Sequence, residues 1–264
     1  MTKSRLDLLL AERGLFESRS RAAAAIMAGH VRLGTGGARA QKPGQMVTED
    51  VEVSVDRGPD YVSRGGVKLA NALDALGLDV TGRRALDVGA STGGFTDVLL
   101  QRGAEHVVAV DVGYGELHWK LREDPRVTVM ERVNARELDC AALPYRPDLV
   151  VADVSFISLR KVLPAALGCS ARDFDVVAMV KPQFELERGQ VGKGGVVRDP
   201  ADRRRALVLV AEAAVAMGHS VYGFASSGLP GPAGNRETFV WAGTNGRPGA
   251  IADIEAAAAE VEPA

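Results

Sequence analysis

The sequence predicts a doubly wound α/β domain with a seven-stranded sheet, preceded by a small α+β module. After about residue 60, short apolar runs alternate with helical segments, which is the pattern of a mostly parallel sheet. The runs are apolar almost throughout, as in strands that are covered on both faces. The chain has 264 residues, 46% of them hydrophobic and 25% charged, so its length and composition suit one large or two smaller globular domains.

The small module is expected at residues 1–56. Leucines recur at helical spacing in its first ten residues, and Ser18 or Ser20 can cap a second helix that ends at Gly29. Valines 51, 53 and 55 alternate with polar residues, as in a half-buried strand. The predicted order is a helix near 6–10, a helix over 21–28, a strand at 31–33, a loop at 34–44 and a strand at 51–55.

An interdomain linker is predicted at residues 57–62, where the sequence Arg-Gly-Pro-Asp offers little to bury. The main domain then spans 63–243 and begins with a helix over 67–76. A tail over 244–264 follows, with one Ala/Glu-rich helix at 250–261. A short connection between the last two strands favours an antiparallel ending. The predicted strands are 84–88, 106–111, 127–130, 148–153, 174–180, 220–225 and 238–242.

Charge and cysteine content limit the binding partners and the cellular compartment that we expect for the protein. The formal net charge is −2, which excludes a chain-wide basic field for nucleic acid, so any such contact must be local. The sequence shows neither an apolar run of membrane-spanning length nor a signal peptide. Cys140 and Cys169 lack metal or redox spacing. We therefore expect a cytoplasmic chain with free thiols, no metal and no stable membrane association.

A glycine loop, Leu86-Asp87-Val88-Gly89-Ala90-Ser91-Thr92-Gly93-Gly94-Phe95, follows the first strand of the main domain. Ligands of open α/β sheets bind at this position. The G-x-x-x-G spacing differs from dinucleotide-binding loops and resembles the first motif of S-adenosylmethionine methyltransferases. Asp111 ends the next strand, where it can bind ribose hydroxyls, and Val112 follows it. Asn134-Ala135 can meet an adenine edge. The alternatives are a ligand-free turn or an NAD site.

Four ionisable residues lie at the edges of the predicted elements. Asp153 and Lys181 end two apolar strands, Lys68 lies in the first helix of the main domain, and Glu237 precedes the last strand. Charged residues that end buried strands are often functional. Taken singly, they could instead be a structural salt bridge, a solvated lysine and a surface carboxylate.

Together these residues resemble the Lys-Asp-Lys-Glu tetrad of FtsJ-like ribose 2′-O-methyltransferases, and the small module resembles an S4 RNA-binding domain. The combination is similar to the TlyA family of rRNA 2′-O-methyltransferases, which are often named haemolysins. The resemblance covers residues 1 to about 243. The phrases that carry it are Tyr61-Val62-Ser63-Arg64-Gly65-Gly66, Asp87 to Phe95, Asp153-Val154-Ser155-Phe156-Ile157-Ser158 and Lys181-Pro182-Gln183-Phe184-Glu185.

The resemblance implies transfer of a methyl group from S-adenosylmethionine to a cytidine ribose in ribosomal RNA. It implies that Lys181 contacts the 2′-hydroxyl, that Asp153 orients it, and that Lys68 and Glu237 assist. A lysine can help either as a neutral base or by stabilising the alkoxide, and the sequence leaves both open. The implied cofactor residues are Asp87, Gly89, Ala90, Ser91, Thr92, Gly93, Gly94, Phe95, Asp111, Val112, Asn134, Ala135 and Asp153.

RNA contacts are expected from local basic groups. Lys3, Arg5, Arg19 and Arg21 lie near the starts of the first two helices, where phosphates can bind. Arg64 would link the linker region to the catalytic site. Phe156 or Tyr114 can stack on a base, although core packing is the simpler expectation for Phe156, and Arg203–Arg205 suits a solvated helix face. The expected partner is ribosomal RNA in ribosomal subunits, not DNA, and the expected state is monomeric.

Three other functions remain possible from the sequence. A membrane-active haemolysin would explain the family name, but no cationic amphipathic helix stands out. A non-catalytic RNA-binding assembly factor would not need the tetrad. A methyltransferase for proteins or small molecules would leave the S4-like module without a role.

Overall fold

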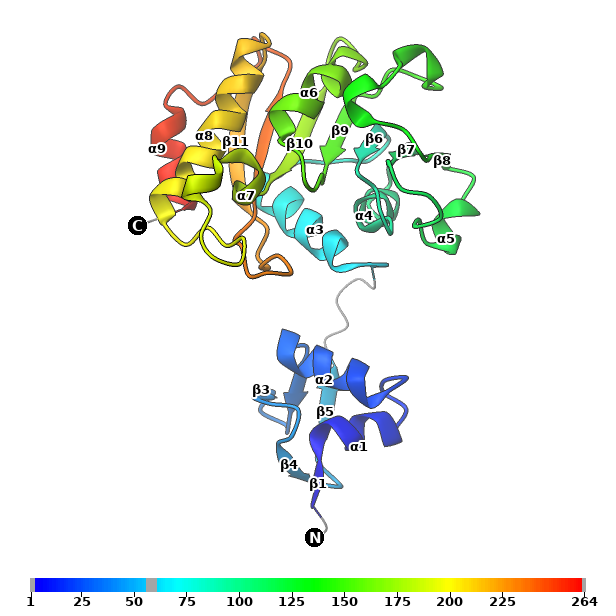
Figure 1. Ribbon diagram of the computed structural model, residues 1–264. Helices are drawn as coiled ribbons and strands as arrows, with labels where there is room; N and C mark the ends of the chain where they lie inside the picture. The colour runs from blue at the N-terminus through cyan, green and yellow to red at the C-terminus, as the bar shows by residue number, and fades with distance from the viewer. Residues whose placement is uncertain (1–2, 56–60, 263–264) are drawn as a thin grey trace. The chain divides into compact units, whose positions relative to one another are not determined.

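The computed structural model describes residues 3–55 and 61–262 (Figure 1). It divides into two compact units, Met1–Asp60 and Tyr61–Ala264. Most of the predicted linker, Arg57–Asp60, lies outside the described residues.

The described part of the first unit, residues 3–55, contains two helices and five very short strands. Its helices and the strands β2 and β5 confirm the sequence prediction, and Ser18 caps α2 by accepting a hydrogen bond from the Arg21 amide at 3.2 Å. The strands β1, β3 and β4 were not predicted, because strands of two or three residues leave no periodic pattern. The elements are β1 (Lys3–Arg5), α1 (Leu6–Glu12), α2 (Arg19–Ala28), β2 (Val31–Leu33), β3 (Ala38–Arg39), β4 (Met46–Thr48) and β5 (Val53–Val55).

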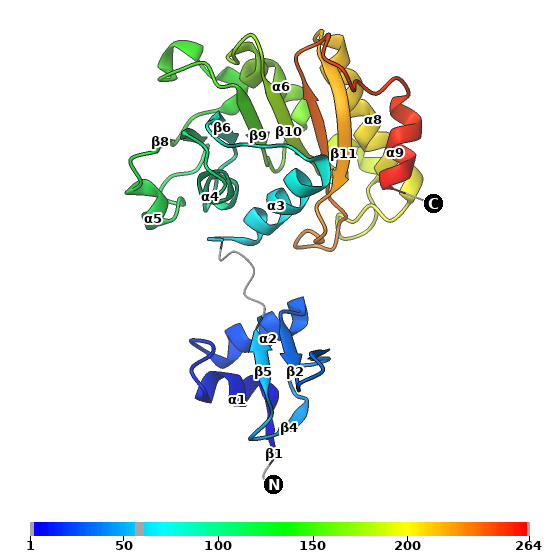
Figure 2. The same cartoon turned by 180° about the vertical axis from the view of Figure 1, so that it is seen from behind.

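The second unit is built on a seven-stranded sheet with the order β11-β12-β10-β9-β6-β7-β8. Figure 2 labels β11, β10, β9, β6 and β8 in this sequence across the sheet. β12 runs antiparallel to both neighbours, and the other pairs are parallel. The predicted doubly wound sheet with an antiparallel last strand is therefore confirmed. The strands are β6 (Arg84–Val88), β7 (His106–Val110), β8 (Val127–Met130), β9 (Leu149–Ala152), β10 (Asp175–Val180), β11 (Ser220–Ser226) and β12 (Thr238–Gly243).

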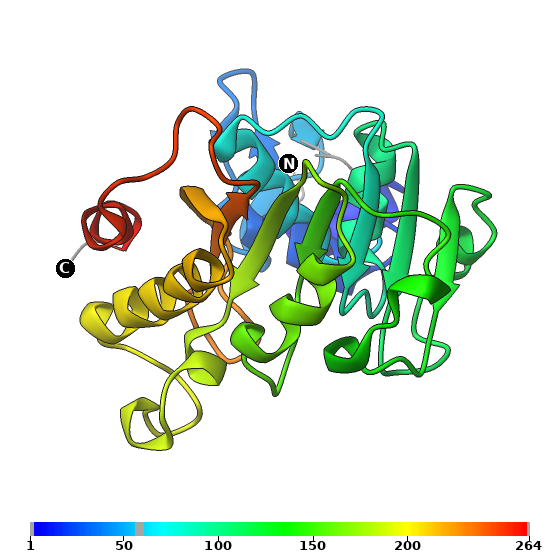
Figure 3. The ribbon, with the colours of Figure 1, turned by 90° about the horizontal axis from the view of Figure 1, so that it is seen from above.

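Helices cover both faces of this sheet, and an apolar core lies on each side. One core contains side chains of α3 (Arg64–Leu76), α4 (Gly94–Gln101) and α5 (Trp119–Arg122). The other contains side chains of α6 (Leu159–Gly168), α8 (Pro200–Ala216) and α9 (Ile254–Val261), and Figure 3 shows α6 and α8 lying across that face. The connections also contain α7 (Pro182–Glu185) and the short 3₁₀ turns η1 (Ala135–Glu137), η2 (Cys140–Ala142) and η3 (Arg188–Gln190).

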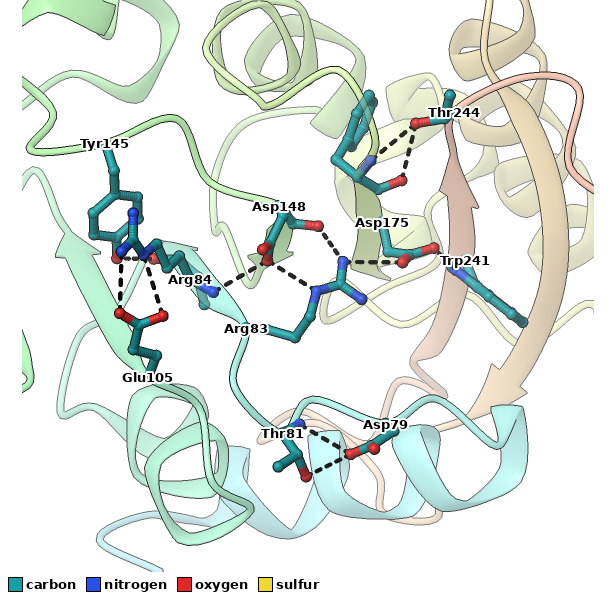
Figure 4. A network of polar contacts seen from close by, with 12 residues as sticks. Asp79, Thr81, Arg83, Arg84, Glu105, Tyr145, Asp148, Asp175, Trp241 and Thr244 are labelled. Carbon is teal, nitrogen blue, oxygen red and sulfur yellow. Dashed lines mark hydrogen bonds and ion pairs between the residues drawn. The ribbon is translucent and has the colours of Figure 1, made fainter.

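The amino ends of the central strands are joined by a charged network (Figure 4). The Arg83 guanidinium contacts Asp148 Oδ1 at 2.9 Å and Asp175 Oδ2 at 3.0 Å. Asp175 also accepts a hydrogen bond from the Trp241 indole at 2.8 Å and pairs with Arg247 at 2.6 Å. Burial opposes ionisation of Asp175, but these donors outweigh it and hold its pKa below the ordinary value. The network joins the starts of β6, β9 and β10 to the end of the antiparallel strand β12.

Two predictions about the periphery were wrong. Cys140 and Cys169 form a disulfide rather than remaining free thiols, with Cα atoms 5.0 Å apart. They are 29 residues apart in sequence and meet because the segment around η1 packs against α6, which their spacing could not reveal.

Arg203 is not part of a solvated helix face, as its place in Arg203–Arg205 suggested. It is buried and pairs with Glu262 at 2.8 Å, just beyond α9. The segment expected as a tail therefore packs on α8 through α9. Among the described residues, no helix combines the length and apolarity needed to cross a membrane.

Candidate active site

The candidate site lies where the parallel strands of the sheet end, which we call the carboxyl edge. Asp153 follows β9 and Lys181 follows β10. Glu237 reaches the same edge because β12 is antiparallel and its first residue, Thr238, pairs with Val180 at the end of β10. The sheet topology therefore brings residues far apart in sequence to one edge.

Lys68 reaches this edge from helix α3, which packs closely against the start of α4. Gly94 makes this approach possible, because a Cβ on it would lie 2.7 Å from the Gly66 nitrogen. Lys68 is buried and forms an ion pair with the buried Glu237. The pair joins α3 to the start of β12.

The second ion pair is more open to solvent. Lys181 Nζ lies 2.5 Å from Asp153 Oδ1, and the side chains are 12% and 25% exposed. Lys181 also donates a hydrogen bond to the Ser155 hydroxyl at 2.8 Å. The same short segment is held at a second point, because the buried Glu185 accepts hydrogen bonds from the Ser158 hydroxyl at 2.5 Å and the Leu159 amide at 2.7 Å. Residues 181–185 thus fix the loop that follows Asp153.

A cavity of about 380 Å³ joins both ion pairs to the glycine loop. This volume lies within the range of small-molecule sites. All four tetrad residues line it, as does Arg64. Four further lining residues were not predicted from the sequence: Ser63, Gly65, Ser155 and Pro232. The first three lie in the phrases that carry the family resemblance. The cavity is lined by Ser63, Arg64, Gly65, Lys68, Gly89, Ala90, Ser91, Thr92, Gly94, Phe95, Asp153, Ser155, Lys181, Pro232 and Glu237.

The glycine loop has the close packing that its sequence indicates. Gly89 has φ of +84°, and a Cβ there would lie 2.4 Å from the Asp153 carbonyl oxygen, so only glycine fits this approach. Ser91 also has a positive φ, of +46°, and its amide donates to Asp111 Oδ2 at 2.8 Å. Asp111 accepts a further hydrogen bond from the Gly113 amide at 2.7 Å. The loop and Asp111 are therefore joined before any ligand binds.

Several predicted cofactor residues do not line the cavity. Gly93 forms the turn into α4 with φ of +94°. Asn134 caps η1, and Ala135 packs against the core. Val112 is 75% exposed beside Asp111. These residues lie along the loops after β6, β7 and β8 rather than around the tetrad.

Asp87 is fully buried beneath the glycine loop. One of its oxygens accepts hydrogen bonds from the Thr96 amide and hydroxyl, at 3.0 and 2.7 Å. The other, Oδ1, has no hydrogen-bond partner among the described residues. Burial raises the pKa of Asp87 to about 7, against the Thr96 hydrogen bonds and with a contribution from the charge of Asp153. Asp87 therefore supports the loop from below.

Phe156 differs from its expected role in the core. Its side chain is 92% exposed, and its φ is +64°, an unusual backbone conformation for a bulky residue. The ring centroid lies 5.3 Å from that of Phe184. Since strained residues cluster at ligand sites, we include this exposed ring next to Ser155 among the candidate site residues.

The predicted basic residues of the first unit are partly neutralised. The buried Asp7 pairs with Arg5 at 2.9 Å and Arg19 at 3.0 Å. The hydrogen bond from Arg5, with further help from Arg19, keeps the pKa of Asp7 well below its usual range despite burial. Arg21 instead pairs with Glu17 at 3.4 Å. Asp7 therefore holds two of the four predicted residues side by side, while Lys3 is exposed in β1.

Among the residues that the structure describes, no cluster of three or more His, Cys, Asp or Glu side chains could hold a metal ion.

Comparisons with known proteins agree with this architecture. The family model of FtsJ-like methyltransferases matches residues 61–244, and that of the S4 domain matches residues 4–53. The chain is 54% identical over 241 residues to the 16S/23S rRNA (cytidine-2′-O)-methyltransferase TlyA of Mycobacterium tuberculosis, covering 90% of this chain and 89% of that protein.

Relatives with a different name match as well. Hemolysin A of Brachyspira hyodysenteriae is 40% identical over 77% of this chain and 84% of its own length. A solved structure named as a hemolysin, from Streptococcus thermophilus, superposes with a TM-score of 0.73 at 41% identity, covering 99% of this chain and 96% of that one.

Proposed function

The chain belongs to the FtsJ-like methyltransferases that carry an S4 domain, and on that basis we propose that it methylates the ribose 2′-hydroxyl of a cytidine in ribosomal RNA, using S-adenosylmethionine. One observation supports this reaction most strongly. Lys68, Asp153, Lys181 and Glu237 line a single cavity together with the glycine loop. The substrate and the cytidine are inferred from the name of the mycobacterial relative.

The cofactor proposal fits the residues present. The cavity is bordered by the tightly turned glycine loop, and the Asp111 carboxylate keeps acceptor capacity for ribose hydroxyls beyond its two amide contacts. Val112 offers an uncovered apolar surface beside it. S-adenosylmethionine would supply an electrophilic methyl group on a sulfonium. Asn134 and Ala135 would meet the adenine edge.

Lys181 is the residue that we assign to the reacting hydroxyl. Transfer of the methyl group to O2′ would require the hydroxyl to lose its proton. Lys181 either accepts that proton as a neutral amine or stabilises the alkoxide as an ammonium. Asp153 and Ser155 fix its position by contacts at 2.5 and 2.8 Å. Such positioning supplies much of the acceleration in a transfer between two bound groups.

The Lys68–Glu237 pair has a supporting role in this proposal. Both side chains are almost completely buried, so neither is free to move far during the reaction. They border the cavity and are suited to orient the target nucleotide.

RNA recognition would use two basic regions, one in each unit. In the S4 unit, Lys3, Arg5, Arg19 and Arg21 would contact phosphates, with Arg5 and Arg19 already held together by Asp7. In the catalytic unit, Arg64 lines the cavity and donates to the Pro230 carbonyl at 3.0 Å. Such contacts position RNA without reading its sequence.

An aromatic surface for the target base would come from Phe156. An exposed aromatic ring beside the cavity-lining Ser155 can stack on a base that has left its helix. Tyr114 is also exposed, but the Arg132 guanidinium lies 4.2 Å from its ring centroid. Phe156 is therefore the better of the two candidates.

Incubation of the protein with isolated ribosomal subunits and S-adenosylmethionine labelled in the methyl group tests the proposal. We expect label at the 2′-oxygen of a cytidine, located by nuclease mapping and mass spectrometry. The proposal would be overturned if the label were found on a base or on protein, or if the ribosomal subunits were not labelled at all. A cofactor titration distinguishes a non-catalytic RNA-binding factor, which would bind rRNA but not S-adenosylmethionine.

The remaining proposals concern the surroundings of the protein. We propose a monomer that acts in the cytoplasm on ribosomal subunits, with no DNA partner and no stable membrane association. In a reducing compartment the Cys140–Cys169 disulfide would open. A haemolysin would instead release the contents of liposomes when added as lipid-free protein, and we expect no such release.

A further inference from the structure

A second hollow, of about 430 Å³, lies on the other side of the loop that carries Glu237. Pro232 and Glu237 border the catalytic cavity, whereas Gly234 and Arg236 border the hollow. The two therefore share one short segment, residues 232–237. The hollow is lined by Val196, Val197, Arg198, Pro200, Arg203, Gly234 and Arg236.

Three arginines line this hollow, and two of them are available to a ligand. Arg203 is buried and its charge is matched by Glu262 at 2.8 Å. Arg236 is two-thirds exposed and lies 4.0 Å from the same carboxylate. The exposed Arg198 side chain has no ion pair or hydrogen bond with any residue that the structure describes. The nearest acid along the chain, Asp199, caps α8. The hollow therefore presents two positive groups.

A buried asparagine fixes the two loops that carry these arginines. Asn235 is 1% exposed, and both ends of its amide are used: Oδ1 accepts from the Val197 amide at 2.9 Å, and Nδ2 donates to the Gly195 carbonyl at 2.8 Å. Arg198 and Arg236 each lie one residue beyond this connection. Their backbones are thus held in a fixed relation before a ligand binds, which lowers the entropy cost of binding.

We propose that this hollow binds a backbone phosphate of the RNA strand that carries the target nucleotide, with Arg198 and Arg236 as its ligands. Guanidinium groups bind phosphates through paired hydrogen bonds, and the shared loop puts the hollow next to the reacting ribose. The inference rests on the proposed function. The site would hold the strand on the Glu237 side, while Arg64 holds it within the cavity.

The test compares the double variant Arg198→Ala/Arg236→Ala with the wild type and with Arg205→Ala. Arg205 is an exposed arginine of α8 that does not line the hollow, so it controls for the loss of surface charge. Binding to an rRNA fragment is measured by fluorescence anisotropy across a salt series. For the double variant we expect roughly tenfold weaker binding at about 0.15 M salt and a log–log salt slope smaller by about 1. The KM for RNA should rise, while kcat and cofactor affinity stay unchanged.

Equal RNA affinity and salt slope for the double variant and Arg205→Ala would overturn the inference. A site for free anions alone would also overturn it. In that case inorganic phosphate would bind the wild type but not the double variant, while the two proteins would bind RNA with equal affinity. Failure of the proposed function looks different, because the wild type itself would not methylate ribosomal RNA.

Discussion

The two edges of the central sheet are both rich in charge, but they differ in what surrounds the charges. At the amino edge, Arg83 connects Asp148 and Asp175, and Trp241 donates to Asp175. At the carboxyl edge, the charged side chains line a cavity of about 380 Å³. A charged residue at the end of a buried strand is thus not functional by its position alone.

This difference assigns separate roles to similar ion pairs. A network whose charges are paired with each other joins strands, and its loss should affect stability. A pair that borders a cavity can exchange a partner for substrate, and its loss should affect catalysis. Four substitutions test this division, in order of decreasing expected effect.

Lys181→Ala should have the largest effect, a loss of methyl transfer of about 10²- to 10⁴-fold, because it removes the group assigned to the hydroxyl proton. Cofactor affinity and thermal unfolding should stay close to those of the wild type. Single-turnover methylation and calorimetric titration measure these quantities. Lys161→Ala, at an exposed lysine on α6, is the control. Near-normal turnover of Lys181→Ala would show that the Lys181–Asp153 pair is not catalytic.

Glu237→Ala should lower methyl transfer, because Glu237 borders the cavity. It should also lower the free energy of unfolding by about 3–5 kcal/mol, because it leaves Lys68 buried without a partner. Chemical denaturation measures this loss. The double variant Lys68→Met/Glu237→Leu removes both charges and should recover most of the stability without recovering activity. If it recovers both, the pair is structural, like those at the amino edge.

Arg83→Ala should lower the free energy of unfolding by only about 1–3 kcal/mol, because Asp175 keeps its contacts with Arg247 and Trp241. At a temperature where the variant is folded, its kcat and RNA affinity should match the wild type. Denaturation and steady-state kinetics on the same preparation decide the matter. A fall in kcat without a fall in stability would contradict the division between the two edges.

The sequence was sufficient to predict the sheet because its strands are strongly apolar and separated by clear turn signals. All seven strands were predicted to within one or two residues. Three strands of the first unit were missed because pairing with neighbours, rather than side-chain pattern, creates them. The Cys140–Cys169 bond and the Arg203–Glu262 pair also depend on tertiary contacts that sequence spacing does not encode.

The site could be predicted in part for a similar reason. Strand ends indicated Asp153 and Lys181, and the family resemblance added Lys68 and Glu237. The antiparallel last strand explains how Glu237 reaches the same edge. Ser155 carried no signal of its own, because its role depends on the position of the Lys181 side chain. Phe156 was misjudged because apolar residues are usually buried, whereas here the ring is exposed on a residue with a positive φ.

Asp87→Asn should have the smallest effect of the four, a change in how the stability of the folded protein depends on pH. In the folded protein burial raises the pKa of Asp87 to about 7, whereas an unfolded aspartate titrates near 4. The folded state therefore holds a proton that the unfolded chain releases, and this contribution to stability is lost as pH rises from about 4 through 7. Asparagine keeps the acceptor for Thr96 and does not titrate.

The melting temperature of Asp87→Asn, relative to that of the wild type, should consequently rise between pH 5 and pH 8. Differential scanning fluorimetry across this range measures it, with Asp173→Asn, at an exposed carboxyl, as the control. A difference that does not change with pH would mean that Asp87 is charged in the folded protein. The carboxyl edge would then hold a buried, uncompensated anion beneath the glycine loop, where the bound sulfonium could stabilise it, and the contrast with the self-paired amino edge would be sharper still.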